Sequence, residues 1–93
     1  MSKYESVIIT KPSNEIAEKV IKKFNKFIDD YADLEKTDEL GIKRLAYTVK
    51  TYDEGYYAIF YFESESDFIY ELERQYRIDD DIIKFMVIKV EEG

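Results

Sequence analysis

The sequence predicts an α+β fold, in which a four-stranded antiparallel sheet carries two helices on one of its faces. Segments rich in β-branched and aromatic residues alternate with two segments whose apolar residues recur at spacings of three and four. Their order along the chain is strand, helix, strand, strand, helix, strand. The 93 residues suffice for a single domain, spanning residues 1–93, with one modest core.

The first strand is expected from Tyr4 to Thr10, where β-branched residues are dense. It ends at Lys11-Pro12, because proline cannot donate a hydrogen bond within a sheet. A helix follows, capped by Ser13 or Asn14 and running to about Asp30. Its predicted apolar stripe is Ile16, Val20, Phe24, Phe27, Ile28 and Tyr31. We interpret the lysines on its other face as solvated.

A long hairpin occupies the middle of the chain. Its first arm is expected from Ile42 to Tyr52 and its return arm from Tyr56 to Phe62. The charged stretch from Asp33 to Leu40 leads into the first arm, with Gly41 interpreted as a bulge. The turn is placed at Thr51–Gly55, since its glycine can take a positive φ and start the return strand.

The last third of the chain supplies the second helix and the fourth strand. The helix is expected from about Glu65 to Tyr76, with Ser64 or Ser66 as its cap. The polar loop Arg77–Asp81 ends it, and the last strand runs from Ile82 to Val90. The acidic tail that follows is expected to fray. This order of elements is that of the ferredoxin-like split βαββαβ sandwich.

The composition excludes several classes of protein. The absence of cysteine excludes disulfides and thiolate metal sites, and the absence of histidine removes the commonest general base and metal ligand. The sequence therefore predicts no enzymatic activity and no cofactor. No apolar run approaches membrane-spanning length, and the N-terminus does not resemble a signal peptide. We expect a cytoplasmic protein.

The charge is unevenly distributed. The formal net charge is −7, which opposes binding to a polyanion. Residues 1–50, however, hold 10 Lys and Arg against 9 Asp and Glu, whereas residues 51–93 hold 4 against 12. Local patches rather than the total charge therefore decide which surface can meet nucleic acid.

Alternation divides the third strand into two apolar faces. One face holds Tyr56, Ala58, Phe60 and Phe62, and the other holds Tyr57, Ile59 and Tyr61. We place the first set against the helices. The second set then lies on the face that no helix covers, where large apolar area marks an interaction site. The alternative is that neighbouring strands and long polar side chains shield these three residues.

Catalytic and metal-binding motifs have little support in the sequence. Asp79, Asp80 and Asp81 form an acidic run, but the spaced ligands of a calcium loop are missing. We interpret this run as a solvated turn. No catalytic residue and no metal ligand is therefore predicted.

Several stretches together are similar to one family, the sixth protein of the bacterial small ribosomal subunit. They are Lys3-Tyr4-Glu5, Pro12, the block from Leu40 to Tyr47, Gly55-Tyr56-Tyr57, Tyr76-Arg77-Ile78, and the run from Ile82 to Val87. The most specific is the block from Leu40 to Tyr47, LGIKRLAY. The resemblance spans the chain, but Thr48 stands where the family often has proline.

The resemblance implies a ribosomal protein that binds the central domain of 16S ribosomal RNA. It also implies a partner, the eighteenth protein of the same subunit, with which the chain acts in assembly and translation. The positions that match family residues near RNA are Lys3, Tyr4, Lys43, Arg44, Lys84 and Lys89. A basic partner would bury the open apolar face formed by Tyr57, Ile59 and Tyr61. The alternative is a ligand-sensing or homo-oligomerising module with the same fold and no RNA binding.

Overall fold

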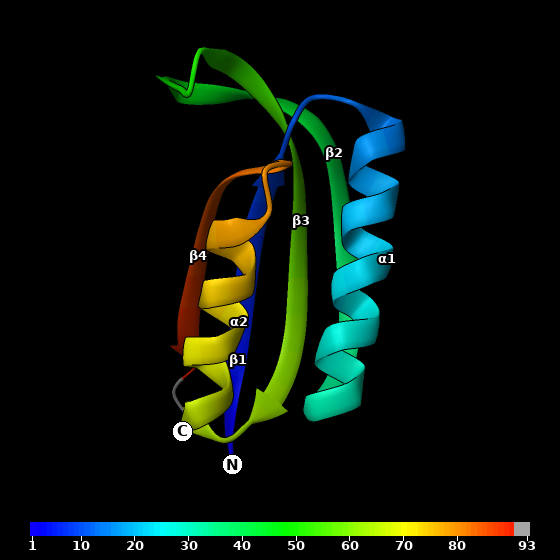
Figure 1. Ribbon diagram of the computed structural model, residues 1–93, viewed down its shortest axis with the longest axis vertical. Helices are drawn as coiled ribbons and strands as arrows, with labels where there is room; N and C mark the ends of the chain where they lie inside the picture. Colours follow the sequence, from blue (N-terminus) through cyan, green and yellow to red (C-terminus); the bar gives the residue numbers. More distant parts are fainter. Residues whose placement is uncertain (91–93) are drawn as a thin grey trace.

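The computed structural model describes residues 1–90, and the acidic tail lies outside these residues. The elements are β1 (Ser2–Thr10), α1 (Asn14–Tyr31), β2 (Asp33–Val49), β3 (Tyr52–Ser64), α2 (Ser66–Ile78) and β4 (Ile82–Val90). The four strands form one antiparallel sheet in the order β2-β3-β1-β4. Both helices lie on the same side of this sheet (Figure 1). The predicted fold class is confirmed.

The core lies between the sheet and the helices. Helix α1 buries Ala17, Val20, Ile21, Phe24 and Ile28, and α2 buries Leu72 and Tyr76. The predicted assignment of the two faces of β3 is confirmed, because Ala58, Phe60 and Phe62 are at most 1% exposed. Tyr31, which was expected on the apolar stripe of α1, is instead 69% exposed at the last residue of the helix.

Local chemistry explains where α1 begins. The Ser13 hydroxyl accepts a hydrogen bond from the amide of Ile16 at 3.3 Å, which caps α1 as predicted. For α2 the predicted cap, Ser64 or Ser66, is wrong: the cap position is Glu65, whose side chain makes no capping hydrogen bond. Across the core, the hydroxyls of Ser6 on β1 and Tyr76 on α2 are 2.6 Å apart, so a buried hydrogen bond joins this helix to the sheet.

The hairpin differs from the prediction in the position of its turn. Val49 pairs with Tyr52, so the turn consists of Lys50 and Thr51, with φ values of +49° and +72°. Gly55 lies within β3 instead. A Cβ atom at Gly55 would lie 2.3 Å from Cγ2 of Ile9, so a bare backbone is needed here for close packing and not for a turn.

Two irregularities bend β2. Gly41 has a φ of +83° and lies at a register shift, which confirms the predicted bulge. The second lies nearer the turn, where residues 45–48 stand between the pairs Arg44–Glu54 and Val49–Tyr52. Four residues of β2 thus oppose one residue of β3. The expected alternation ends here, and the side chain of Tyr47 is 82% exposed.

Candidate functional site

The face of the sheet opposite the helices is the first candidate surface. The register aligns Tyr57 with Ile9 and Lys84, Ile59 with Val7 and Met86, and Tyr61 with Glu5 and Ile88. Three neighbouring strands therefore contribute apolar side chains to one continuous area. The contribution of β1 and β4 was not predicted, because alternation within a strand does not fix its register against its neighbours.

The exposure of this face is uneven. Met86 and Ile88, on the edge strand β4, are 53% and 44% exposed. Tyr57, Ile59 and Tyr61 are half-buried. The Lys36 ammonium lies 4.7 Å from the centre of the Tyr61 ring, so one long polar side chain does shield part of the predicted surface. Shielding thus reduces the apolar surface without closing it.

The surroundings of Tyr61 raise the pKa of its phenol. Loss of contact with water raises the pKa of Tyr61, and the nearby carboxylates of Asp38 and Glu5 raise this pKa further. Lys36 and Asp38 lie 3.8 Å apart beside the ring. This end of the open face therefore carries both signs of charge.

The predicted cations do not share one side of the sheet. Lys3, Lys43 and Lys84 pair with Glu63, Gly55 and Ile9, which places them on the open side. Arg44 and Lys89 occupy the alternate positions of their strands and belong to the helix side. The Gly41 bulge does not bring Lys43 and Arg44 onto one side, because these two residues pair with the consecutive residues Gly55 and Glu54.

Tyr4 differs from the expectation of a surface contact. It is 7% exposed and lies on the helix-facing side of β1. Its ring stacks on that of Phe62, with the centroids 5.7 Å apart. The alternation of β1 places it in the core together with Ser6 and Ile8, so Tyr4 is a packing residue.

Several cations in the described part of the chain have no acidic partner. Lys3 lies 3.9 Å from Glu35, and Lys23 and Lys26 of α1 are also paired. Within residues 1–90, by contrast, the structure shows no ion pair for Lys19, Lys22, Lys43, Arg44, Lys50, Arg77, Lys84 or Lys89. The first two lie on α1, the next three in the hairpin, Arg77 in the last turn of α2, and the last two in β4.

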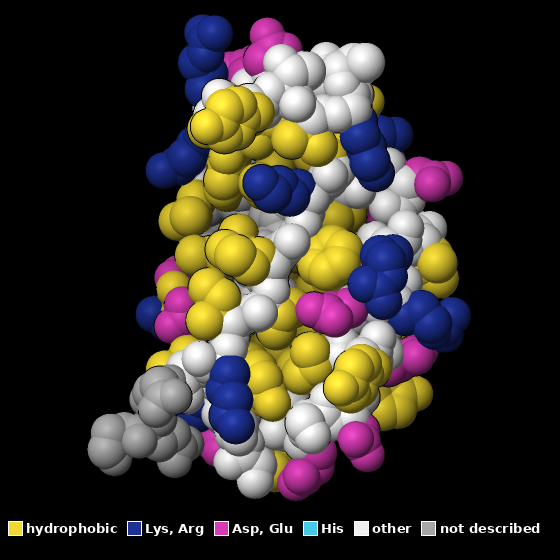
Figure 2. Space-filling view, turned by 90° about the vertical axis from the view of Figure 1, so that its left-hand side faces the viewer, with side chains coloured by type: hydrophobic (Ala, Val, Ile, Leu, Met, Phe, Trp, Pro, Cys, Tyr) yellow, Lys and Arg dark blue, Asp and Glu magenta, His cyan; other side chains and the backbone are white. Residues whose placement is uncertain are grey.

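Figure 2 shows the side of the molecule on which β4 lies. Hydrophobic side chains gather over the middle of this side, and side chains of both charges, Lys and Arg as well as Asp and Glu, stand between and around them. An apolar area with cations at its margin is suited to contact with another macromolecule, because the apolar part favours burial and the cations attract polyanions.

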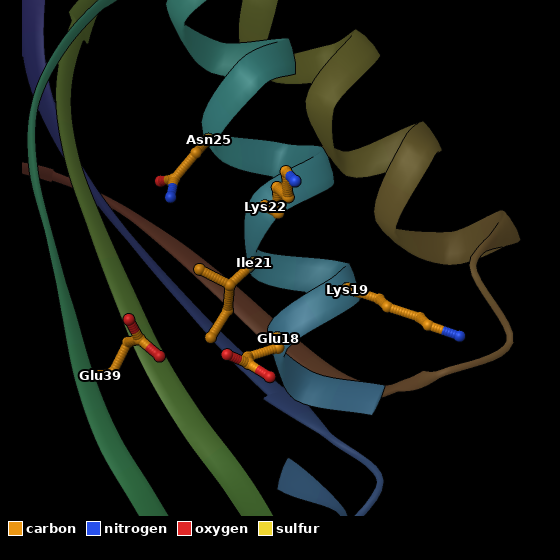
Figure 3. A pocket seen from close by; sticks show the side chains of 6 residues that line it. All are labelled: Glu18, Lys19, Ile21, Lys22, Asn25 and Glu39. Carbon is orange, nitrogen blue, oxygen red and sulfur yellow. The ribbon is translucent and has the colours of Figure 1, made fainter. Parts of the chain in front are cut away.

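A hollow of about 440 Å³ between α1 and β2 is a weaker candidate (Figure 3). Its lining residues are Glu18, Lys19, Ile21, Lys22, Asn25 and Glu39. The Lys19 side chain points away from the strands, and the Asn25 amide oxygen already accepts a hydrogen bond from Thr37. The polar groups do not converge on one point, so this hollow offers no catalytic arrangement.

The acidic loop before β4 is held by local contacts. Asp79 accepts a hydrogen bond from the amide of Asp81 and forms an ion pair of 2.8 Å with Lys23. Asp81 pairs with Lys11 at 3.3 Å. In the portion that the structure describes, no three acidic side chains are grouped as metal ligands. Neither described helix is long and apolar enough to cross a membrane.

The fold and this surface define a class, that of small α+β proteins that act through surface contacts. Comparison with known proteins then assigns the family. The chain belongs to the ribosomal protein S6 family, whose model matches residues 3–89. The family resemblance predicted from the sequence is thereby confirmed.

Relatives and a solved structure agree with this assignment. Small ribosomal subunit protein bS6 of Helicobacter pylori strain G27 is 38% identical over 98% of this chain, which spans 66% of that relative. The bS6 protein of Halalkalibacterium halodurans is 36% identical over 99% of this chain and 100% of its own length. The crystal structure of 30S ribosomal protein S6 from Thermotoga maritima has 28% identity and a TM-score of 0.89, covering 96% of this chain and 87% of that one.

These findings settle the broad function. The chain is a ribosomal protein of the bacterial small subunit and not an enzyme, and its place is the ribosome in the cytoplasm. The predictions of a non-enzymatic protein and of a ribosomal location are confirmed.

Proposed function

We propose that the chain binds the central domain of 16S ribosomal RNA together with the eighteenth protein of the small subunit, during assembly and translation. The observation that carries this proposal is the helix-free face of the sheet, which is apolar in its middle and has the exposed cations Lys3, Lys43 and Lys84 on the same side. In this proposal the apolar middle meets the protein and the cations meet the RNA.

The apolar part fits a protein better than RNA. Ile59, Val7 and Met86 form the central row of the open face and offer neither stacking rings nor hydrogen-bond donors. Burial of such a row contributes about 25 cal/mol for each Å² removed from water. Because the free chain has a net charge of −7, a basic partner would also lower the repulsion from RNA.

The RNA contacts are assigned to exposed cations. We propose Lys3, Lys43, Arg44, Lys84 and Lys89, all of which have exposed side chains. Tyr4 is left out, since its ring is buried against Phe62. Phosphate contacts of this kind supply affinity and orientation more than sequence specificity.

The RNA contacts are tested with the double variant Lys43→Ala and Arg44→Ala. Both side chains are exposed, so the free energy of unfolding should change by less than about 0.5 kcal/mol. Sedimentation of cell lysates should show less of this variant travelling with small subunits, and more so at higher salt. The matched control is Lys19→Ala with Lys22→Ala, which removes the same charge from exposed positions of α1 and should sediment like the unchanged chain.

Normal incorporation of the hairpin variant, combined with a large loss of stability, would refute this assignment of the RNA contacts.

The protein contact is tested separately. Ile59→Asp and Met86→Asp each put a carboxylate into the central apolar row, and both should abolish capture of the purified eighteenth protein. The control is Tyr70→Asp, since Tyr70 is 75% exposed on α2 and should tolerate the change.

If the isolated chain instead dimerises through this row and does not sediment with ribosomal RNA, the homo-oligomerising module becomes the better interpretation.

A further inference from the structure

A second hollow lies where the hairpin turn approaches the start of β4. Its volume is about 270 Å³, and its lining includes Lys50, Arg77 and Lys84 together with Ile82 and Phe85. The three cations come from three elements: the hairpin turn, the last turn of α2 and the beginning of β4. Figure 1 shows the tip of the hairpin extending past the end of the sheet and leaning toward the side on which β4 lies.

The lining of this hollow carries only one sign of charge. No Asp or Glu is among its lining residues, and within residues 1–90 none of the three cations forms an ion pair. The hollow between α1 and β2, by contrast, is lined by Glu18 and Glu39 as well as by lysines. Three positive charges without counter-charges attract an anion, and the apolar wall strengthens this attraction by excluding water.

The nearby acidic loop does not neutralise this site. Asp79 and Asp81 are already bound to Lys23 and Lys11, at 2.8 and 3.3 Å. Only Asp80 of this loop remains exposed without an ion pair in the described chain. The three cations therefore exceed the free carboxylate of the loop by two charges.

The geometry holds one of the cations in place. The Arg77 guanidinium carbon lies 6.0 Å from the centre of the Phe85 ring, within the range of a cation–π contact. The backbone of Lys50 is set by the two-residue turn, in which both φ values are positive. Holding the guanidinium in place before binding reduces the entropy that a ligand must overcome.

We propose that this hollow, formed by Lys50, Arg77 and Lys84, binds a phosphate group. The planar guanidinium of Arg77 can donate two parallel hydrogen bonds to phosphate oxygens, and the two ammonium groups supply point charges. The chemistry suits either a backbone phosphate of RNA or a free phosphate anion. We assign the site to RNA in the first place, and this assignment rests on the proposed function above.

The test compares two double variants of the full chain that lose the same charge. Lys50→Gln with Lys84→Gln removes two cations of the hollow, and Lys19→Gln with Lys22→Gln removes two exposed cations of α1. Arg77 is kept, so that its packing on Phe85 is not disturbed. Backbone amide shifts are followed by NMR as inorganic phosphate replaces chloride at constant ionic strength.

The unchanged chain and the α1 variant should show saturable shifts at residues 50, 77 and 84, and the hollow variant should lose them. A second measurement uses a transcript of the 16S central domain with the eighteenth protein. The slope of log affinity against log salt should fall by about one for each lost phosphate contact in the hollow variant, and should not fall in the control.

The outcomes separate the two proposals. Saturable phosphate shifts with an unchanged salt slope would assign the hollow to a free phosphate anion. Absence of RNA binding by the unchanged chain, with the phosphate shifts intact, would overturn the proposed function and leave the site standing. Equal losses in the two double variants, or no saturable shift at residues 50, 77 and 84, would overturn the site.

Discussion

The buried hydrogen bond between Ser6 and Tyr76 offers the sharpest test of how the helix layer is fixed to the sheet. The two side chains are 0% and 1% exposed, and their oxygens are 2.6 Å apart. Burial raises the pKa of the Tyr76 phenol above its ordinary value, so the protonated form of this hydroxyl is favoured further. Removal of one partner leaves the other hydroxyl buried with no hydrogen bond.

The expected magnitudes follow from this geometry. Tyr76→Phe and Ser6→Ala should each lower the free energy of unfolding by about 1–3 kcal/mol, the cost of one unsatisfied buried hydroxyl. In a domain of this size, each kcal/mol of lost stability lowers Tm by roughly 4–8 °C. The double variant has no orphaned hydroxyl. Its loss should therefore be smaller than the sum of the two single losses, by about 1 kcal/mol or more.

The assay is urea unfolding followed by far-UV circular dichroism. The slope of the free energy of unfolding against urea concentration should be the same for all variants. Tyr70→Phe serves as the control, because Tyr70 is 75% exposed and loses only a solvated hydroxyl. If the loss of the double variant equals the sum of the two single losses within about 0.3–0.5 kcal/mol, the two hydroxyls do not interact. That result would refute the reasoning.

Two glycine exchanges should change the stability in opposite directions. Gly55→Ala places a methyl group 2.3 Å from Ile9 Cγ2 and 3.0 Å from the Thr10 carbonyl oxygen, so urea unfolding should show a loss of about 1–3 kcal/mol. An unchanged urea midpoint for Gly55→Ala would mean that β1 and β3 can move apart at this position at no cost in stability. Thr51 is a β-branched residue held at a φ of +72°, and Thr51→Gly removes the resulting backbone strain of roughly 1–2 kcal/mol. This gain exceeds the entropic cost of glycine, about 0.5–1 kcal/mol, so the variant should be more stable. A lowered Tm for Thr51→Gly would contradict this account of the turn.

The sequence was sufficient for the elements whose patterns are local. Alternation along β3 predicted that Ala58, Phe60 and Phe62 face the helices, and the bounds of β4 match the prediction residue for residue. The turn was misplaced because Gly55 is a strong turn signal. In the structure this glycine serves a contact with Ile9, which is distant in the sequence. A residue required for tertiary packing cannot be distinguished from a turn residue by local pattern.

The candidate site shows the same limit. Tyr57, Ile59 and Tyr61 were predicted from one strand, but their neighbours Val7 and Met86 depend on the register of three strands. The phosphate site is harder still to predict. Lys50, Arg77 and Lys84 come from separate elements, and only the inclination of the hairpin brings the first of them to the other two.

The contradiction between a net charge of −7 and an RNA partner is resolved by distance. Electrostatic interactions in physiological salt decay over about 8 Å, whereas the molecule measures 36 × 26 × 21 Å. Residues 41–54 at the tip of the hairpin hold three cations against two carboxylates, Asp53 and Glu54, a local excess of one positive charge, and most other carboxylates are screened from this tip. A phosphate approaching the hairpin therefore meets a locally basic surface on an acidic protein, and the total charge acts mainly against RNA that approaches from other directions.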